Sequence, residues 1–305
     1  MKQFKLGNSA LEVPAIAVGC MRMSSLKISD AEKFILTAIE EGANFFDHAD
    51  IYGDGKCEEI FSKAINMNDN IRKQIILQSK CGIRKGMFDF SKEHILNSVD
   101  GSLKRLKTEY LDILLLHRPD TLMEPDEVAE AFDLLKSSGK VRYFGVSNQN
   151  PMQIQLLKKS VKQPILANQL QFSITNANMI SNGMNVNMEN NASINRDGSI
   201  LEFCRLNDIT IQPWSPFQYG FFEGVFLNND KFPELNKTIN EVAEKYGISN
   251  TTITLAWILR HPANMQPVTG TMNLNHLKQC CKASQIKLSR EEWYSIFRSA
   301  GNILP

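Results

Sequence analysis

Four side chains of complementary chemistry follow short apolar runs in the first 117 residues of the chain. Asp47, Lys80 and His117 each stand at the end of such a run, and Tyr52 lies five residues after Asp47. A phenol whose pKa is near 10 is a poor proton donor at neutral pH, and a neighbouring ammonium lowers that pKa. Asp47 would keep Lys80 charged and oriented, while His117 could hydrogen-bond a carbonyl oxygen. The set predicts proton transfer to a polarised substrate oxygen.

These residues can meet only if their strands end on the same side of one sheet. Short apolar runs alternate with helical patterns, and eight runs have the character of buried parallel strands. Parallel strands joined by right-handed helical crossovers form a closed barrel, in which the strand ends share one rim. The predicted strands are 15–18, 44–47, 75–80, 111–117, 143–147, 165–171, 210–214 and 266–268, and the predicted helices are 30–41, 57–65, 92–106, 126–138, 151–159, 199–207, 235–246 and 252–260.

We therefore expect an α/β fold over residues 1–305, a single (β/α)8 TIM barrel with an N-terminal β-hairpin and a C-terminal covering helix. The hairpin is expected in residues 2–13, and Trp257 and Trp293 are expected in the core or the barrel cover. The alternative is an open doubly wound sheet. That fold would need G-x-G-x-x-G after its first strand to hold a dinucleotide, and Val18-Gly19-Cys20-Met21-Arg22 lacks it.

Composition favours a small partner over a nucleic acid or a membrane. The net charge of +1 comes from 34 basic and 33 acidic residues mixed along the chain, and 43% of the residues are apolar. Neither a signal peptide nor a run of about 18 apolar residues is present, so we expect a soluble, cytoplasmic protein. The six cysteines show no zinc spacing, and no metal site is expected. They should be reduced and passively packed, although Cys57 and Cys81 each follow a lysine, which could lower a thiol pKa.

Two loop segments allow two interpretations each. Residues 176–195 are rich in Asn and Met and follow the sixth strand, so they form either a solvated insertion or a substrate lid. Residues 218–226 carry four aromatic side chains and two glycines, which suits either a flap over a dinucleotide or packing against the barrel wall.

Several segments resemble the signatures of the aldo-keto reductases, in order from about Gly7 to Ala283. They are Asn44-Phe45-Phe46-Asp47 with Ile51-Tyr52-Gly53, Ser79-Lys80-Cys81, Tyr110-Leu111-Asp112 with Leu116-His117-Arg118-Pro119-Asp120, and the run from Gly139 to Asn148. The bacterial members are the most similar. The resemblance implies an NADP-dependent carbonyl reductase in which Tyr52 is the general acid beside Asp47, Lys80 and His117.

The same resemblance implies where the cofactor lies. Ser147, Asn148 and Gln169 match positions that hydrogen-bond the nicotinamide amide, and Trp214 matches the aromatic residue on which the ring stacks, commonly Tyr in relatives. The resemblance implies NADPH, but no Lys or Arg lies between Val268 and Leu277 to bind a 2′-phosphate, so NADH is kept as an alternative. The remaining implied cofactor residues are Met21, Ser215, Pro216, Phe217, Gly270, Thr271, Met272, Asn273 and His276, of which Thr271, Asn273 and His276 are the candidate 2′-phosphate ligands. Residues 270–273 are expected to open a helix whose free backbone amides suit a phosphate.

Two other functions remain as alternatives, and a third lacks the residues that it needs. The potassium-channel β subunits of the same family suggest a cofactor-binding regulatory subunit that senses redox state and turns over slowly. A lyase could use Lys80 as a Schiff base, although the adjacent acid and phenol favour a charged lysine. A metal hydrolase of the barrel type would need a His-x-His pair on the first strand, and residues 15–19 contain no histidine.

Overall fold

Eight parallel strands form the centre of the molecule. A computed structural model describes residues 1–305, and its sheet has the order β11-β10-β9-β8-β5-β4-β3-β14. All seven pairings within that order are parallel, and in one register Asp47 lies beside Gln78. The strands are β3 (Ala17–Gly19), β4 (Phe45–Asp47), β5 (Ile76–Cys81), β8 (Leu111–Leu116), β9 (Val141–Ser147), β10 (Ile165–Gln171), β11 (Thr210–Trp214) and β14 (Val268–Thr269).

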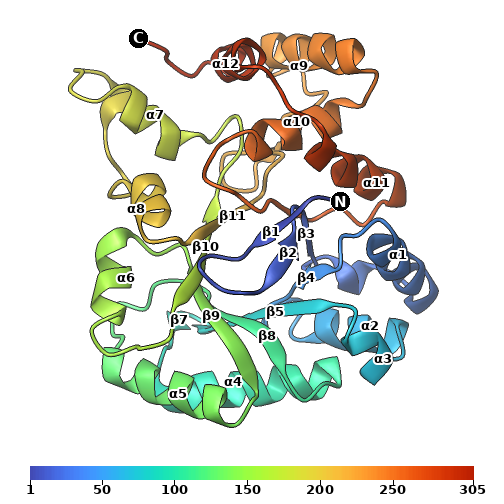
Figure 1. Cartoon of the computed structure of the whole chain (residues 1–305), viewed down its shortest axis with the longest axis vertical. Helices are drawn as coiled ribbons and strands as arrows, with labels where there is room; N and C mark the ends of the chain where they lie inside the picture. The colour runs from blue at the N-terminus through green and yellow to red at the C-terminus, as the bar shows by residue number, and fades with distance from the viewer.

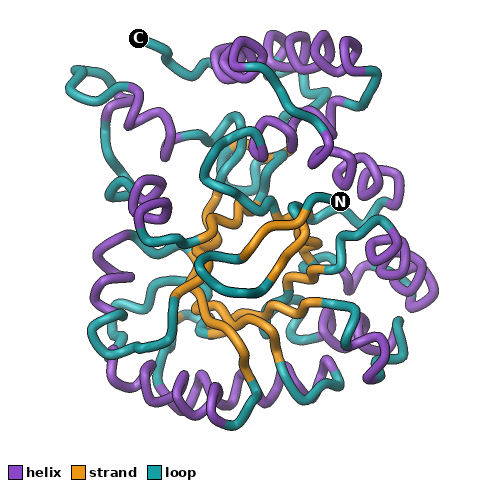
Figure 2. Tube along the Cα trace, viewed as in Figure 1, coloured by secondary structure: helices purple, strands orange, loops and turns teal.

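The two edges of this sheet approach each other. The backbone amide of Gln266, just before β14, donates a 2.9 Å hydrogen bond to the carbonyl oxygen of Ile211 in β11. Figures 1 and 2 show the strands as a nearly closed barrel surrounded by helices, so the predicted (β/α)8 TIM barrel is confirmed. The helices are α1 (Ile28–Glu40), α2 (Lys56–Ala64), α3 (Asp69–Arg72), α4 (Lys92–Leu106), α5 (Pro125–Ser137), α6 (Pro151–Leu157), α7 (Asn178–Met184), α8 (Ile200–Leu206), α9 (Pro233–Tyr246), α10 (Asn250–Leu259), α11 (Leu274–Lys282) and α12 (Arg290–Ser299).

The predicted N-terminal hairpin covers the bottom of the barrel. It consists of β1 (Gln3–Lys5) and β2 (Glu12–Pro14), and its buried Leu6 and Val13 join an apolar cluster with residues of the barrel strands. Gly7 lies at the tip with φ of +53°, and a Cβ there would lie 2.9 Å from the carbonyl oxygen of Leu166 at the start of β10. Only glycine accepts that approach at that φ, so the hairpin sits directly against the N-terminal ends of the strands.

Two tryptophans attach the C-terminal helix to the rest of the protein. The rings of Trp257 in α10 and Trp293 in α12 stack with centroids 4.8 Å apart and planes 7° apart. Each indole N–H also donates to the other residue's backbone oxygen at 3.0 Å. Both residues therefore belong to the core, as predicted. No helix of the chain has the length and apolar character needed to cross a membrane.

Residues 176–195 lie beside the barrel, where they contact the C-terminal tail. They contain α7 and a short 3-10 turn, and Asn185 donates to the backbone oxygen of Ile303 at 3.3 Å. The neighbouring Ile174 accepts a hydrogen bond of 2.9 Å from Asn302. None of the residues that line the main cleft comes from this segment. The structure thus favours the surface insertion over the substrate lid.

All six cysteines are free and buried. Burial raises the pKa of the Cys81 thiol well above its usual range, with smaller contributions from the negative charges of Asp50 and Asp89. The alternative of a lowered thiol pKa at Cys81 is therefore wrong, because desolvation outweighs any effect of the preceding lysine.

Candidate active site

The four residues that end or follow the predicted strands converge at the C-terminal end of the barrel. The Lys80 ammonium donates to Asp47 Oδ2 at 2.7 Å, to the Tyr52 hydroxyl at 3.0 Å and to the backbone oxygen of His48 at 2.8 Å. The His117 ring meets the Tyr52 ring edge-on, with centroids 6.0 Å apart. Lys80 and Asp47 are fully buried, and Tyr52 and His117 are partly exposed to the cleft. A single ammonium therefore connects the carboxylate to the phenol.

The electrostatics of this group differ from the sequence-based expectation for Tyr52. Burial raises the pKa of the Tyr52 phenol above 10, and the attraction of Lys80 offsets only part of that rise. For Lys80, burial alone would lower the pKa, but Asp47 and Tyr52 raise it above its usual value. Burial and the nearby Lys80 hold the pKa of His117 well below 6.5. At neutral pH the site therefore contains a protonated phenol, an ammonium and a neutral imidazole.

A ladder of buried glutamines holds the other oxygen of Asp47. Gln78 donates to Asp47 Oδ1 at 2.7 Å and Gln169 donates to the same atom at 3.1 Å. Gln78 also donates to Gln212 at 2.9 Å, and Gln212 donates onward to Gln266 at 2.9 Å. Three of these glutamines were missed by the sequence analysis, although Gln78 lies two residues before Lys80 and therefore on the same strand face. The ladder fixes the carboxylate that orients Lys80.

One large cleft opens over this group. Its volume is about 810 Å³, which lies within the range typical of small-molecule sites. Asp47, Tyr52 and His117 line it, whereas Lys80 lies behind them. All but two of the predicted cofactor residues also line it, namely Met21, Ser147, Asn148, Gln169, Trp214, Ser215, Pro216, Phe217, Gly270, Thr271 and His276.

At the end of the cleft that contains Asp47, Tyr52 and His117, amide and hydroxyl groups form a short hydrogen-bonded chain beside Trp214. Asn148 donates to Ser147 Oγ at 2.7 Å, and Trp214 donates its indole N–H to Asn148 Oδ1 at 3.0 Å. Gln169 donates to Asp47 and Gln212 through Nε2, while its Oε1 accepts no hydrogen bond in the structure. The indole ring is thus fixed in orientation, next to amide groups that can bind a planar ligand.

At the far end of the cleft, the helix start differs from the prediction. Asn273 caps α11 and accepts hydrogen bonds from the amides of Asn275 and His276, at 2.9 and 3.1 Å. Met272 and Asn273 do not line the cleft. The expectation that the first amides of α11 are free is wrong for those of Asn275 and His276, because the side chain of Asn273 accepts hydrogen bonds from both.

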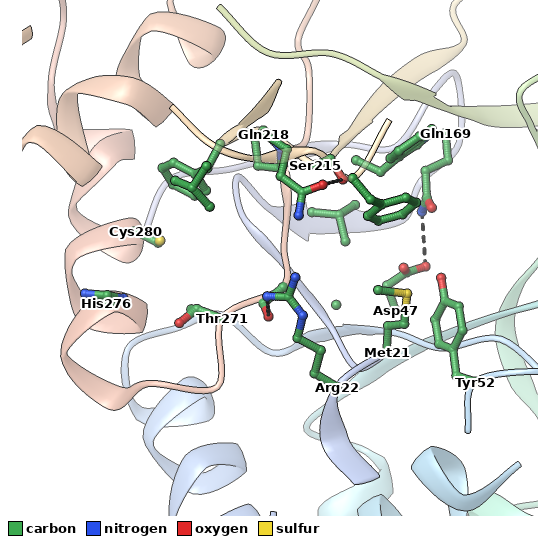
Figure 3. Close-up of a pocket in the computed structure, with 18 of the residues that line it drawn as sticks. Met21, Arg22, Asp47, Tyr52, Gln169, Ser215, Gln218, Thr271, His276 and Cys280 are labelled. Carbon is green, nitrogen blue, oxygen red and sulfur yellow. Dashed lines mark hydrogen bonds between the residues drawn. The ribbon is translucent and has the colours of Figure 1, made fainter. Parts of the chain in front are cut away.

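A positive charge between the two ends of the cleft comes from Arg22, a residue that the sequence analysis did not assign. The Arg22 guanidinium forms no ion pair and makes only a long hydrogen bond, 3.4 Å, to the backbone oxygen of Gly270. Figure 3 shows it pointing into the cleft, between Thr271 and His276 on one side and Met21 and Asp47 on the other. Arg22 directly follows the predicted cofactor residue Met21, but spacing alone does not place a loop side chain.

The aromatic loop of residues 218–226 fits each of its two interpretations in part. Phe226 is fully buried in the core, as barrel packing requires. Phe222 is half exposed, lines the cleft and lies over Trp214 with ring centroids 5.9 Å apart and planes 23° apart. Phe222 therefore lies where a flap over the cleft would place it, whereas Phe226 attaches the loop to the core.

The buried histidine after β4 predicts an acid-sensitive fold. His48 is fully buried against Phe61, neither ring nitrogen has a partner, and burial lowers its pKa to about 3. Below pH 6.5 the unfolded chain gains a proton that the folded chain does not, so stability falls with decreasing pH at about 1.4 kcal/mol per pH unit. When the pH falls from neutrality to about 5, the free energy of unfolding of His48→Met should decrease by about 2 kcal/mol less than that of the wild type.

Urea unfolding at both pH values measures this difference. His276→Met is the matched control, because His276 is exposed on α11, and it should keep the wild-type dependence. Equal acid losses in His48→Met and the wild type would contradict the assignment of this proton to His48.

Comparison with known proteins agrees with this geometry. A model of the Aldo/keto reductase family matches residues 15–299. The uncharacterized oxidoreductase YcsN of Bacillus subtilis is 35% identical over 301 residues, 94% of this chain and 94% of that protein. The 6-dehydroglucose reductase of Agrobacterium fabrum is 28% identical over 95% of each chain. An aldo/keto reductase from Klebsiella pneumoniae, solved in complex with NADP and acetate, matches with a TM-score of 0.79 and 26% identity over 100% of this chain and 97% of that one.

The resemblance in the strand-end segments is thereby confirmed over nearly the whole chain. The parallel barrel, the full-length family match and relatives named as oxidoreductases agree with one another. The chain belongs to the aldo/keto reductase family and is an oxidoreductase by that membership.

Proposed function

We propose that the protein reduces aldehydes or ketones with NADPH, and that Tyr52 supplies the proton. The observation that carries this proposal is the Lys80 ammonium, which donates to Asp47 at 2.7 Å and to the Tyr52 hydroxyl at 3.0 Å beside the cleft. The raised pKa of Tyr52 keeps the phenol protonated before the reaction. A carbonyl oxygen hydrogen-bonded to this hydroxyl would receive the proton as negative charge develops on it.

Each neighbour of Tyr52 then has a defined part. Lys80 stabilises the phenolate that remains after proton transfer, and Asp47 holds Lys80 in place. His117 is neutral, so it can polarise the carbonyl oxygen by hydrogen bonding without competing as an acid. The phenolate regains a proton from solvent through the cleft, where Tyr52 is partly exposed.

The donors along the cleft fit a nicotinamide dinucleotide. Ser147, Asn148 and Gln169 would hold the carboxamide and Trp214 would support the ring. When bound, the reduced ring would supply the hydride that the carbonyl carbon accepts. Arg22 lies between the two ends of the cleft, where a diphosphate needs a cation. Thr271 and His276 at the far end are the remaining candidates for a 2′-phosphate.

A direct assay tests the proposed activity. NADPH and NADH are each incubated with the protein and a panel of aldehydes and ketones, and the loss of cofactor absorbance is followed against formation of the alcohol. Turnover with NADPH supports the reductase. Tight NADPH binding with very slow turnover on every carbonyl would favour the redox-sensing alternative. Trapping of a carbonyl substrate on Lys80 by borohydride would favour the lyase.

Arg22→Gln should weaken NADPH and NADH binding alike, each by about tenfold. The loss of one charge-assisted contact to the diphosphate, which both cofactors share, gives this magnitude. Fluorescence titration of the protein with each cofactor measures it. Arg84→Gln is the matched control, because Arg84 is paired with Asp89 at 2.7 Å and does not line the cleft. Selective weakening of NADPH alone would contradict the diphosphate assignment and place Arg22 at the 2′-phosphate instead.

A further inference from the structure

A second arginine of the cleft lies at the reacting end, where the proposed chemistry gives it no part. Arg118 follows His117 at the end of β8 and lines the cleft. Its guanidinium carbon lies 5.5 Å from the centroid of the Trp214 ring. The side chain is half buried, and this burial lowers the pKa of the guanidinium, with a partial offset from Tyr52. Arg118 therefore lies near the phenol and is partly removed from water.

No group of the protein neutralises this charge. Arg118 takes part in none of the nine ion pairs, and its guanidinium donates no hydrogen bond to the protein. Asp120 is close in sequence, but its two oxygens accept from the amides of Phe90 and Leu122, each at 2.8 Å. Asp47 is already paired with Lys80. The reacting end of the cleft thus carries one uncompensated positive charge.

We propose that Arg118 determines substrate specificity by binding a carboxylate, so that the preferred substrates are aldehydes or ketones that carry an acid group. This inference rests on the proposed reductase activity. A guanidinium presents a planar pair of donors that matches a carboxylate, and a single unpaired cation is balanced by a single negative charge. The anionic groups of the proposed cofactor can instead bind Arg22, which lies between the two ends of the cleft.

The apolar side chains that line the cleft describe the rest of the substrate. Ile51 and Ile83, which the proposed cofactor does not use, line the same cleft and present apolar surface. A carbonyl compound with an apolar body and one terminal carboxylate satisfies these walls, the phenol and the guanidinium together. A neutral polyol would leave the charge unmatched.

Matched pairs of probes test this specificity. Succinic semialdehyde is compared with butanal, and 4-carboxybenzaldehyde with methyl 4-formylbenzoate, with NADPH in excess. The wild type should favour the acid of each pair by about 10- to 100-fold in kcat/KM. Arg118→Gln should reduce the acid-to-neutral ratio by at least tenfold, mainly through KM for the acid. Arg118→Lys, which keeps the charge without the planar fork, should retain an intermediate ratio. The control Arg84→Gln should keep the wild-type ratio.

A binding measurement on the wild-type protein provides an independent readout. In the presence of NADPH, butyrate and benzoate should raise the melting temperature and compete with the aldehyde, whereas butyramide and benzamide should do neither. Equal turnover of acid and neutral probes, or carboxylates and amides with equal effects, would overturn the proposal even if Arg118 variants fail to fold. Absence of turnover with every carbonyl would instead refute the reductase activity itself, so the two failures are distinguishable.

Discussion

Tyr52→Phe should lower kcat for aldehyde reduction by about 10³-fold while leaving the affinity for NADPH unchanged. The substitution removes only the hydroxyl that accepts from Lys80 at 3.0 Å, and the ring still meets His117 edge-on. Lys80 keeps its bonds to Asp47 and to the backbone oxygen of His48. The site therefore retains its charges and its cleft but loses its proton donor.

Steady-state kinetics with a reactive aldehyde, combined with titration of NADPH, measure the two quantities separately. Tyr143→Phe is a matched control, because Tyr143 lies on β9 and does not line the cleft. It should turn over at the wild-type rate. If Tyr52→Phe kept most of its reductase rate with unchanged NADPH affinity, another group would be the acid, and His117 would be the first to test.

The convergence of Asp47, Lys80 and His117 could be predicted because it depends on topology alone, and Tyr52 follows Asp47 by only five residues. Once the apolar runs are arranged as parallel strands, their C-terminal ends must share a rim, and Asp47, Lys80 and His117 end or follow three of them. The bounds were less accurate: the first strand was predicted at 15–18 and the eighth at 266–268, whereas β3 is Ala17–Gly19 and β14 is Val268–Thr269. Very short barrel strands carry too few residues for the apolar pattern to fix their ends.

The features that were missed depend on where side chains point and how far they are buried. Gln78 and Gln212 interrupt apolar runs, and only the closed barrel shows that they meet across its interior. Arg22 and Arg118 lie in or next to loops, whose side chains no periodicity places. The charge of Lys80 predicted a lowered pKa for Tyr52, but burial has the larger effect and raises that pKa. The depth of burial cannot be read from the sequence.

One error had a visible signal in the sequence. Asparagine is among the most favoured N-cap residues, so Asn273 at the start of a helix pattern indicates that its side chain bonds the first helical amides. Those amides were nevertheless expected to bind a phosphate. Arg22, Thr271 and His276 still line the cleft and can donate hydrogen bonds to the phosphates of the proposed cofactor. The first amides of α11 are therefore not needed for this purpose.

Lys80→Met should destabilise the fold by about 3 kcal/mol and abolish most of the reductase activity. Lys80 and Asp47 are almost fully buried as a pair, with 0% and 3% of their side chains exposed. Removing one partner leaves the other charge uncompensated in the barrel interior, which is more costly than removing both. Tyr52 also loses the ammonium that would stabilise its phenolate. Chemical unfolding and steady-state kinetics measure the two effects on the same preparation.

The double variant Asp47→Asn/Lys80→Met separates stability from catalysis. It removes both charges, and the amide oxygen that replaces the carboxylate of Asp47 can still accept from Gln78 and Gln169 of the glutamine ladder. We therefore expect it to recover at least half of the stability lost in Lys80→Met, while its kcat stays as low. Recovery of turnover along with stability would mean that Lys80 serves the fold alone and that the phenol needs no neighbouring cation. An equal loss of stability in both variants would mean instead that the tight packing of the lysine stem, rather than the ion pair, is what the barrel requires.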